Sequence, residues 1–172
     1  DCPMTSEPLG VVAGITPFNF PVMVPLWMIP LAITTGNTFI LKPSEQTPLA
    51  GIKLAEYLKE AGLPNGVFNV VNGGKTIVEA LCDHSDIKAL AFVGSSNVAK
   101  IVYNRCSQNS KRSLCLGGAK NHMIVVPDAD KDSTAKGLLA SSMGSAGQRC
   151  MAASVAVGVS KIDHIIDQLV EE

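Results

Sequence analysis

Short runs of apolar residues alternate along the chain with longer segments in which apolar and polar positions mix. Continuous apolar runs bounded by glycine, proline or asparagine are typical of strands buried on both faces of a parallel sheet. Strands are therefore expected at residues 9–13, 38–41, 67–71, 87–93, 113–116 and 123–126, and a further apolar run covers 155–159.

The longer segments repeat apolar side chains every three or four positions, which predicts helices with one buried face. The first helix, 22–34, is apolar and interrupted by proline, and Pro25 suits its first turn. The second helix, 48–61, stops at Gly62, because glycine readily adopts the backbone conformation that ends a helix. Further helices are expected from apolar stripes at Ile77, Val78, Leu81 and Cys82, at Val98, Ile101, Val102 and Cys106, and at Ala135, Leu138, Leu139 and Met143.

Capping patterns mark the starts of two helices in the last third of the chain. Asp128-Ala129-Asp130 precedes the third of these stripes, and an aspartate side chain can accept hydrogen bonds from the first turn of a helix. Ser160 and Asp163 form a second capping pattern. The helix expected after it carries a stripe of Ile162, Ile165, Ile166 and Leu169.

Strands and helices alternate along most of the chain. This order predicts an α/β, Rossmann-like fold, in which a mainly parallel sheet is flanked by helices and linked by right-handed crossovers. Ligands of such sheets bind beyond the carboxyl ends of the strands. The loops after Gly14, Leu41, Val93 and Leu116 are therefore expected to form the binding edge.

The composition limits the kinds of partner. The chain has 172 residues, 47% hydrophobic and 17% charged, with a formal net charge of -1. This near-neutral balance lacks the basic footprint of a nucleic-acid-binding protein. The longest apolar stretch, 20–33, is too short and too rich in proline to cross a bilayer. Neither nucleic acid nor a membrane is expected as a partner, and the apolar content favours a sheet buried on both faces or a piece of a larger assembly.

The cysteines and histidines form no recognisable framework. The five cysteines are unevenly spaced without a C-x-x-C pair, and the three histidines have no partner at ligand spacing. No disulfide framework or metal site is expected, and a reducing compartment fits, such as the bacterial cytoplasm or the mitochondrial matrix. The start, Asp1-Cys2-Pro3, has neither an initiator methionine nor the basic segment of a signal peptide. We therefore expect the chain to begin inside a longer protein.

A candidate nucleophile is the thiol of Cys150, in the run Gly147-Gln148-Arg149-Cys150. The thiolate is the reactive form of cysteine, and a neighbouring guanidinium favours it. Arg149 can also hold a substrate carboxylate through two parallel hydrogen bonds. Taken alone, a single cysteine in a mildly apolar context is more often an inert buried residue, and Arg149 fits a structural salt bridge equally well, so both alternatives stay open.

Three loops carry groups that suit a nucleotide or an oxyanion. Lys42 and Glu45 follow a strand and can hydrogen-bond a ribose, where a carboxylate favours NAD over NADP. Gly94-Ser95-Ser96 lies at a strand-to-helix turn, which suits a pyrophosphate. Asn19 lies between two phenylalanines and can donate its amide to a developing oxyanion. Ordinary surface charges, a packing glycine and a turn-stabilising asparagine explain the same residues, and no G-x-G-x-x-G is present.

Five motifs follow one another in an order that is more specific than any one of them. They are Thr16-Pro17-Phe18-Asn19-Phe20-Pro21, Lys42-Pro43-Ser44-Glu45, Ala61-Gly62-Leu63-Pro64-Asn65-Gly66, Phe92-Val93-Gly94-Ser95 and Gly147-Gln148-Arg149-Cys150. Together they resemble the aldehyde dehydrogenase superfamily, from its cofactor domain through its nucleophile. The resemblance implies an NAD-binding domain at 1–146 and the start of a catalytic domain at 147–172. It also implies a homo-oligomer, a tetramer, for the full-length enzyme.

One departure from the superfamily sharpens the resemblance. Most members carry a glutamate, in a Glu-Leu-Gly-Gly-Lys pattern, that activates water for thioester hydrolysis. The aligned segment here is Leu116-Gly117-Gly118-Ala119-Lys120, so Leu116 takes the place of the glutamate. With Gly118-Ala119-Lys120-Asn121-His122 and the run 147–152, the chain resembles the CoA-acylating methylmalonate semialdehyde dehydrogenases. The resemblance implies a thioester on Cys150 that persists until CoA accepts the acyl group.

The same resemblance implies a role for each candidate residue. Cys150 attacks methylmalonate semialdehyde or malonate semialdehyde, while Asn19 and the Cys150 backbone N–H hold the oxyanion. Hydride passes to NAD, and decarboxylation and transfer to CoA give propionyl-CoA or acetyl-CoA. Arg149 is implied to bind the substrate carboxylate. The residues implied to bind NAD are Thr16, Phe18, Lys42, Glu45 and Ser95, with Gln46 where relatives often carry a basic residue and Gly117 offering only backbone.

Three alternatives stay open on the sequence. A hydrolytic NAD-dependent aldehyde dehydrogenase would release a free acid without CoA. A folded, non-catalytic piece of the cofactor domain would form no NADH, and it is an alternative because members of the superfamily are much longer than this chain. A nucleotide-binding regulatory module would leave the motif around Cys150 unexplained.

Overall fold

The computed structural model describes residues 2–172. The chain divides into two compact units, Asp1–Gly117 and Gly118–Glu172, and each is described by itself. Among the described residues, no helix combines the length and the apolar character needed to span a membrane. All five cysteines are free thiols.

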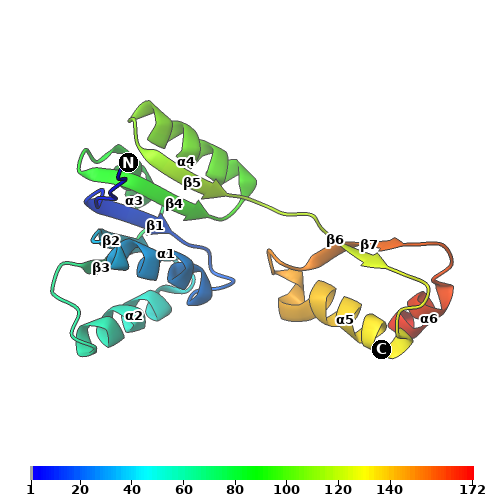
Figure 1. Cartoon of the computed structure of the whole chain (residues 1–172). Helices are drawn as coiled ribbons and strands as arrows, with labels where there is room; N and C mark the ends of the chain where they lie inside the picture. Colours follow the sequence, from blue (N-terminus) through cyan, green and yellow to red (C-terminus); the bar gives the residue numbers. More distant parts are fainter. Residues whose placement is uncertain (1) are drawn as a thin grey trace. The chain divides into compact units, whose positions relative to one another are not determined.

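The first unit is built on a five-stranded sheet in the order β3-β2-β1-β4-β5 (Figure 1). Every pair of neighbouring strands is parallel, which confirms the predicted parallel sheet. The chain builds outward from β1 through β2 to β3, then crosses back to add β4 and β5 on the other side. This reversal creates a topological switch point between β1 and β4, where open α/β sheets bind ligands. The strands are β1 (Val11–Ile15), β2 (Thr38–Lys42), β3 (Phe68–Val70), β4 (Ile87–Val93) and β5 (Arg112–Leu116).

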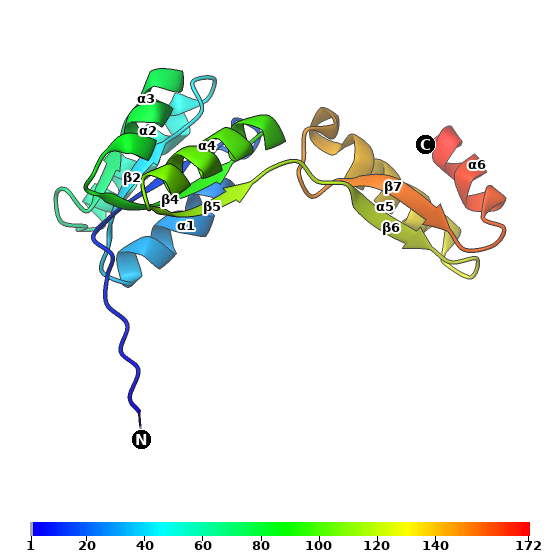
Figure 2. The same cartoon turned by 90° about the horizontal axis from the view of Figure 1, so that it is seen from above.

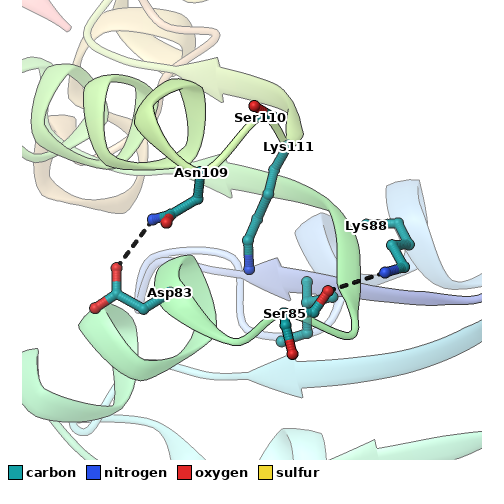
Figure 3. Close-up of a pocket in the computed structure, with 7 residues that line it drawn as sticks. Asp83, Ser85, Lys88, Asn109, Ser110 and Lys111 are labelled. Atoms are coloured by element: carbon teal, nitrogen blue, oxygen red, sulfur yellow. Dashed lines mark hydrogen bonds between the residues drawn. The ribbon is translucent and has the colours of Figure 1, made fainter.

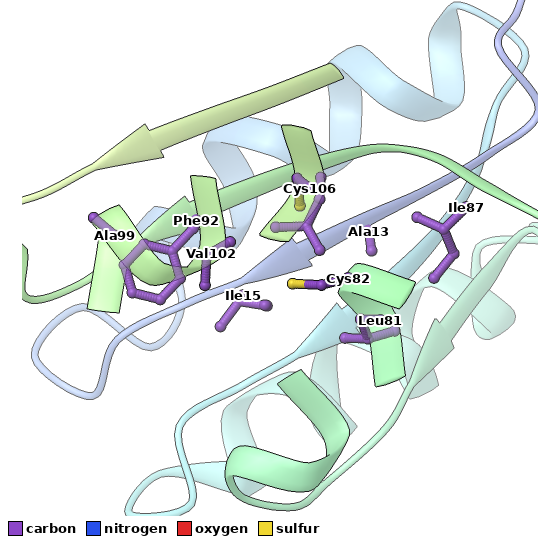
Figure 4. Close-up of a cluster of buried hydrophobic side chains, with 10 residues drawn as sticks. Ala13, Ile15, Leu81, Cys82, Ile87, Phe92, Ala99, Val102 and Cys106 are labelled. Carbon is purple, nitrogen blue, oxygen red and sulfur yellow. The ribbon is translucent and has the colours of Figure 1, made fainter. Parts of the chain in front are cut away.

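Helices cover both faces of this sheet, as the alternation of elements predicts. They are α1 (Met23–Thr34), α2 (Pro48–Glu60), α3 (Lys75–Asp83) and α4 (Ser96–Gln108). One face packs on α3 and α4 through a core that includes Ala13, Leu81 and Val102 (Figure 4). The opposite face packs on α1 and α2 around Val12 and Phe39. Adjacent residues of β1 thus point into different cores, because side chains alternate along a strand.

The first strand ends later than predicted, because Gly14 lies inside it and does not close it. β1 runs from Val11 to Ile15. A Cβ added at Gly14 would lie 2.5 Å from Cζ of Phe39, so the missing side chain makes room for that ring on the neighbouring strand. This glycine is a packing device within the sheet, and the loop at the binding edge starts at Thr16.

The buried face of α4 also differs from the predicted stripe. Ala99, Val102 and Cys106 are buried, whereas Val98 and Ile101 are 39% and 60% exposed. The apolar periodicity favours the large side chains, but the helix contacts the sheet through a face that includes the small Ala99. A small residue lets the helix axis approach the strands, and this rotates the larger neighbours toward solvent.

The second unit pairs β6 (Asn121–Val125) with β7 (Ala153–Gly158) in a two-stranded parallel sheet (Figure 2). The predicted apolar run 155–159 lies largely in β7. Two α-helices, α5 (Lys131–Met143) and α6 (Asp163–Glu171), surround a small core, and the 3-10 turn η1 (Gly144–Gly147) follows α5. The buried members of this core are Val125, Leu138 and Ile165.

One of the two predicted helix caps in this unit is confirmed and the other is wrong. Asp130 is the N-cap of α5, where its carboxylate accepts a hydrogen bond from the Ser133 N–H at 2.8 Å. That hydrogen bond holds the pKa of the Asp130 carboxyl below its ordinary value. The N-cap of α6 is Ile162, and Ser160 lies outside the helix with a φ of 60°. Ile162 packs against the small core, so apolar contact rather than a side-chain cap fixes where α6 begins.

Candidate active site

The loops that follow β1, β2, β4 and β5 carry the predicted cofactor residues. All of these strands are parallel, so their carboxyl ends share one edge of the sheet. The switch point between β1 and β4 lies at the middle of that edge. The structure therefore gathers the predicted side chains of the first unit on the edge where this class of sheet binds its ligands.

Thr16 comes directly after β1 and is almost completely buried, with 4% of its surface exposed. Its backbone N–H donates to the carbonyl of Lys42 at 3.1 Å, which joins the ends of β1 and β2. Its hydroxyl is buried and has no hydrogen-bond partner among the described residues. A buried hydroxyl without a partner is costly, so this oxygen is a natural contact for a bound polar ligand.

Lys42 and Glu45 form an ion pair at the end of β2. The Lys42 side chain is buried, and its Nζ lies 3.2 Å from Oε1 of the half-exposed Glu45. A hydrogen bond from the Glu45 backbone N–H and contact with the Lys42 ammonium hold the pKa of the Glu45 carboxyl below its ordinary value. Gln46 is exposed beyond them, and its N–H donates to the Ser44 hydroxyl at 3.3 Å. The edge thus presents a buried cation and an ionised carboxylate next to each other.

The first turn of α4 closes the other side of the switch point. Ser95 is the N-cap, and its hydroxyl accepts a hydrogen bond from the Val98 N–H at 3.4 Å. Gly117, after β5, packs directly on this turn. A Cβ added at Gly117 would lie 2.8 Å from Oγ of Ser96 and 3.0 Å from its Cα. The lack of a side chain therefore leaves the amino end of α4, with its positive dipole end, close to the end of β5.

The loop after β1 also contains the predicted oxyanion ligand. Asn19 is half-buried in the turn that leads to α1, and the neighbouring Phe18 exposes 41% of its surface. Leu116, at the end of β5, exposes 43% of its surface, and its carbonyl accepts a hydrogen bond from the Gly94 N–H at 3.1 Å. Asn19 and Leu116 thus both lie on the binding edge of the first unit. Their chemical roles stay predictions.

Cys150 lies in the second unit, in a tight turn between η1 and β7. The turn is closed by a hydrogen bond from the Ala152 N–H to the Arg149 carbonyl at 3.1 Å, and the Cys150 side chain is half-buried. Immediately before it, the backbone is left-handed at Ser145, Ala146 and Gly147, with φ of 56°, 54° and 73°. Only glycine adopts this conformation without strain. The thiol thus follows a strained segment, as is common at functional sites.

Side chains from β6 and α5 support this turn and the strand after it, and a side chain of the turn itself bonds back to α5. The amide of Asn121, on β6, donates to the carbonyls of Cys150 at 2.7 Å and Ala152 at 3.0 Å. The Ser141 hydroxyl accepts a hydrogen bond from the backbone N–H that opens β7, at 3.0 Å. Nη1 of Arg149 donates to the Ala140 carbonyl at 3.1 Å. No pattern in the sequence marks Asn121 or Ser141 for this role, although Asn121 stands in one of the motifs that carry the family resemblance.

A separate cavity of about 330 Å³ lies at the opposite edge of the sheet, near the starts of β4 and β5 (Figure 3). The Lys111 ammonium at this cavity donates to the carbonyl of Leu81 at 3.2 Å and to that of His84. Leu81 lies in the last turn of α3, and His84 is the C-cap of that helix. Lys88 donates to the Ser85 carbonyl at 2.9 Å. Both ammonium groups are thus engaged by the protein backbone. Within residues 2–172, no group of three or more histidine, cysteine, aspartate or glutamate side chains could hold a metal ion.

Comparison with known proteins places this geometry in a family. The model of the aldehyde dehydrogenase family matches residues 2–172. Malonate-semialdehyde dehydrogenase 1 of Geobacillus kaustophilus is 57% identical over 169 residues, which are 98% of this chain and 35% of that protein. Malonate-semialdehyde dehydrogenase of Lacticaseibacillus casei is 61% identical over 150 residues, which are 87% of this chain and 30% of that protein.

Solved structures agree with these relatives. A Sinorhizobium meliloti protein described as a methylmalonate-semialdehyde dehydrogenase, in complex with NAD, superposes with a TM-score of 0.92 at 55% identity. The match covers 96% of this chain and 34% of that one. The chain spans about a third of the length of the relatives it matches. Because the family model and these relatives match nearly the whole chain, the chain belongs to the aldehyde dehydrogenase family.

Proposed function

We propose that this chain supplies the cofactor edge and the nucleophile of an NAD-dependent, CoA-acylating semialdehyde dehydrogenase. The substrate is malonate semialdehyde or methylmalonate semialdehyde, and the product is acetyl-CoA or propionyl-CoA with loss of carbon dioxide. The observation that carries the proposal is the 57% identity to a malonate-semialdehyde dehydrogenase over 169 of the 172 residues, a match that includes both the Cys150 turn and the binding edge of the sheet.

The binding edge fits a dinucleotide. The unpartnered hydroxyl of Thr16 offers a buried polar contact, and the missing side chain of Gly117 lets the end of β5 approach the start of α4, whose positive dipole end suits a phosphate. Lys42 and Glu45 together can hydrogen-bond the ribose hydroxyls. Because the Glu45 carboxylate is ionised, it disfavours a 2′-phosphate and selects NAD over NADP. The residues proposed to hold NAD are Thr16, Phe18, Lys42, Glu45, Gln46, Ser95 and Gly117; NAD, when bound, accepts a hydride.

The covalent chemistry belongs to Cys150. Its thiolate attacks the aldehyde carbon, and the Asn19 amide and the Cys150 backbone N–H stabilise the oxyanion of the tetrahedral adduct. Loss of a hydride from that adduct leaves a thioester on Cys150. The β-carboxylate then leaves as carbon dioxide, and a proton takes its place on the α carbon. A CoA thiol finally attacks the carbonyl, which releases acyl-CoA and restores the thiol.

Arg149 and Leu116 determine which substrate and which acceptor this chemistry uses. The guanidinium of Arg149 carries several N–H donors, and the Ala140 carbonyl accepts from one of its nitrogens, so donors remain for a substrate carboxylate. Leu116 stands where most of the superfamily has a glutamate base, and an alkyl side chain cannot activate water. The thioester on Cys150 therefore persists until a thiol accepts the acyl group.

The assembly and the compartment are also part of the proposal. We propose a homo-oligomer, a tetramer, for the full-length protein, since that is the assembly the family resemblance implies. A reducing compartment, such as a bacterial cytoplasm or a mitochondrial matrix, keeps the Cys150 thiol available.

The proposal is tested by following NADH absorbance in the full-length protein with malonate semialdehyde and NAD, with and without CoA. Sustained NADH formation is expected only when CoA is present, together with acetyl-CoA in the products. Cys150→Ala is expected to abolish both. Sustained turnover to a free acid without CoA would instead identify a hydrolytic enzyme, and NADP supporting turnover as well as NAD would contradict the role given to Glu45.

A further inference from the structure

The turn that carries Cys150 is held mainly by side chains from elsewhere in the second unit. Its own internal hydrogen bond joins Ala152 to Arg149, but the carbonyls of Cys150 and Ala152 both point to the side chain of Asn121. One amide therefore fixes the backbone on the nucleophile and on the residue two positions later. The two segments it joins are about 30 residues apart in sequence.

The β6–β7 ladder explains why a side chain is needed here. The register of the pair shifts between Asn121 and His122, so the regular ladder starts only at His122 and Val155. Backbone groups before that point are out of register with the partner strand. The Asn121 amide supplies donors on the irregular side of the shift, where the two carbonyls require them.

An asparagine is well suited to this task. Its NH₂ group has two hydrogens, and the carbonyls of Cys150 and Ala152 accept both, at 2.7 and 3.0 Å. Aspartate has the same shape but presents acceptors to two acceptors. Leucine has a similar size and no polar group. Replacing Asn121 with leucine therefore removes the two donors without adding charge. Replacing it with aspartate removes them and adds a negative charge, and both replacements keep nearly the same volume.

We propose that Asn121 is a positioning residue for the Cys150 nucleophile, which it holds by donating to the backbone carbonyls of Cys150 and Ala152 within the turn. This inference rests on the proposed function of Cys150. Asn121 acts through the backbone and touches no reacting atom. Reactions at a bound thiol depend on near-attack geometry, and displacement by about 1 Å costs on the order of a hundredfold in rate.

The test compares Asn121→Leu and Asn121→Asp with a matched control, Asn69→Leu, in the full-length protein. Asn69 is also a strand asparagine that donates to one carbonyl, that of Gly66 at 2.8 Å, but it lies in the first unit. Both Asn121 variants are expected to lower kcat about tenfold or more while KM for NAD stays within about twofold. The control is expected to retain the turnover of the parent.

Two measurements that need no turnover complete the test. Hydrogen exchange in the peptide covering 148–153 is expected to be faster in Asn121→Leu, with no change over α6. The pH profile of Cys150 alkylation by iodoacetamide is expected to differ between Asn121→Leu and Asn121→Asp, because only the latter adds a negative charge beside the turn. The alkylation of Cys2, which is exposed, provides the reference within each sample.

The outcomes separate the inference from the proposed function. Unchanged kcat and unchanged exchange at 148–153 would overturn the inference, and so would faster exchange throughout 118–172, which would show that Asn121 holds the whole unit. If the parent protein forms no NADH, the proposed function fails. Loosening confined to 148–153, with altered alkylation of Cys150, would then still support the positioning of the thiol by Asn121.

Discussion

The contact between Gly117 and the first turn of α4 allows a sharp test of the cofactor edge. In Gly117→Ala the new methyl group would lie 2.8 Å from Oγ of Ser96 and 3.0 Å from its Cα. Carbon atoms in contact normally lie about 3.5–4.0 Å apart. The hydroxyl can rotate away, but the Cα belongs to a 13-residue helix and cannot move alone. The end of β5 must therefore separate from α4 by about 0.5–1 Å.

Such overpacking costs about 1–3 kcal/mol of the free energy of unfolding. For a unit of this size, about 4 °C per kcal/mol is a reasonable conversion, so the midpoint of thermal unfolding is expected to fall by about 4–12 °C. Fluorescence of Trp27, the one tryptophan in the sequence, reports the unfolding of the first unit from within α1. NAD is also expected to raise the midpoint less in the variant than in the parent, because the shifted strand disturbs the proposed phosphate site.

Gly137→Ala provides the matched control. Gly137 lies inside α5, and a Cβ added there would meet nothing within 4 Å. The substitution is expected to stabilise the second unit by about 0.5–1 kcal/mol, because alanine favours the helix, and to leave the Trp27 transition unchanged. A Gly117→Ala protein that unfolds at the parent temperature and gains the same stabilisation from NAD would refute the packing argument.

Three further predictions concern the stability of single elements. Ala146→Gly is expected to stabilise the second unit by up to about 1 kcal/mol in chemical denaturation followed by circular dichroism, since it removes a left-handed alanine; a loss of stability would contradict the strain. Lys111→Met is expected to destabilise the first unit by about 1–3 kcal/mol in urea, because two carbonyls at the end of α3 lose their donor; an unchanged Trp27 midpoint would contradict this. Hydrogen bonds from Arg105 hold the pKa of Asp83 below its ordinary value, so the unfolded state binds more protons as the pH falls and stability declines below about pH 5. Asp83→Asn is expected to flatten that decline in urea titrations across pH, and an identical acid dependence would exclude this ion pair as a cause.

Most of the sheet of the first unit follows from the sequence, because its strands are continuous apolar runs and a parallel sheet buries both faces. β4 was predicted at its observed limits. The errors have packing causes. A glycine that serves as a turn signal elsewhere lies inside β1 to accommodate Phe39, and α4 turns a small alanine, not its larger neighbours, toward the sheet. Such contacts depend on the partner element, which a local pattern does not contain.

The cofactor edge was predictable for a similar reason: once the strands are parallel, the loops after them must share an edge. The side chains that hold the Cys150 turn were not predictable. Asn121 and Ser141 reach the Cys150 turn through a register shift in β6–β7 and a contact with α5, and neither leaves a periodic signal. The division into a cofactor domain at 1–146 and a catalytic domain from 147 stays a prediction. The boundary between the two compact units falls between Gly117 and Gly118.

The proposed function depends most on a thioester at Cys150 that only a thiol can remove. The direct measurement is peptide mass spectrometry of the full-length protein after mixing with malonate semialdehyde and NAD in the absence of CoA. We expect a single burst of NADH, an acetyl group on the peptide that contains Cys150, and its disappearance as acetyl-CoA when CoA is added. An unmodified Cys150 together with steadily accumulating acid would show that water completes the turnover, and would contradict the proposed function.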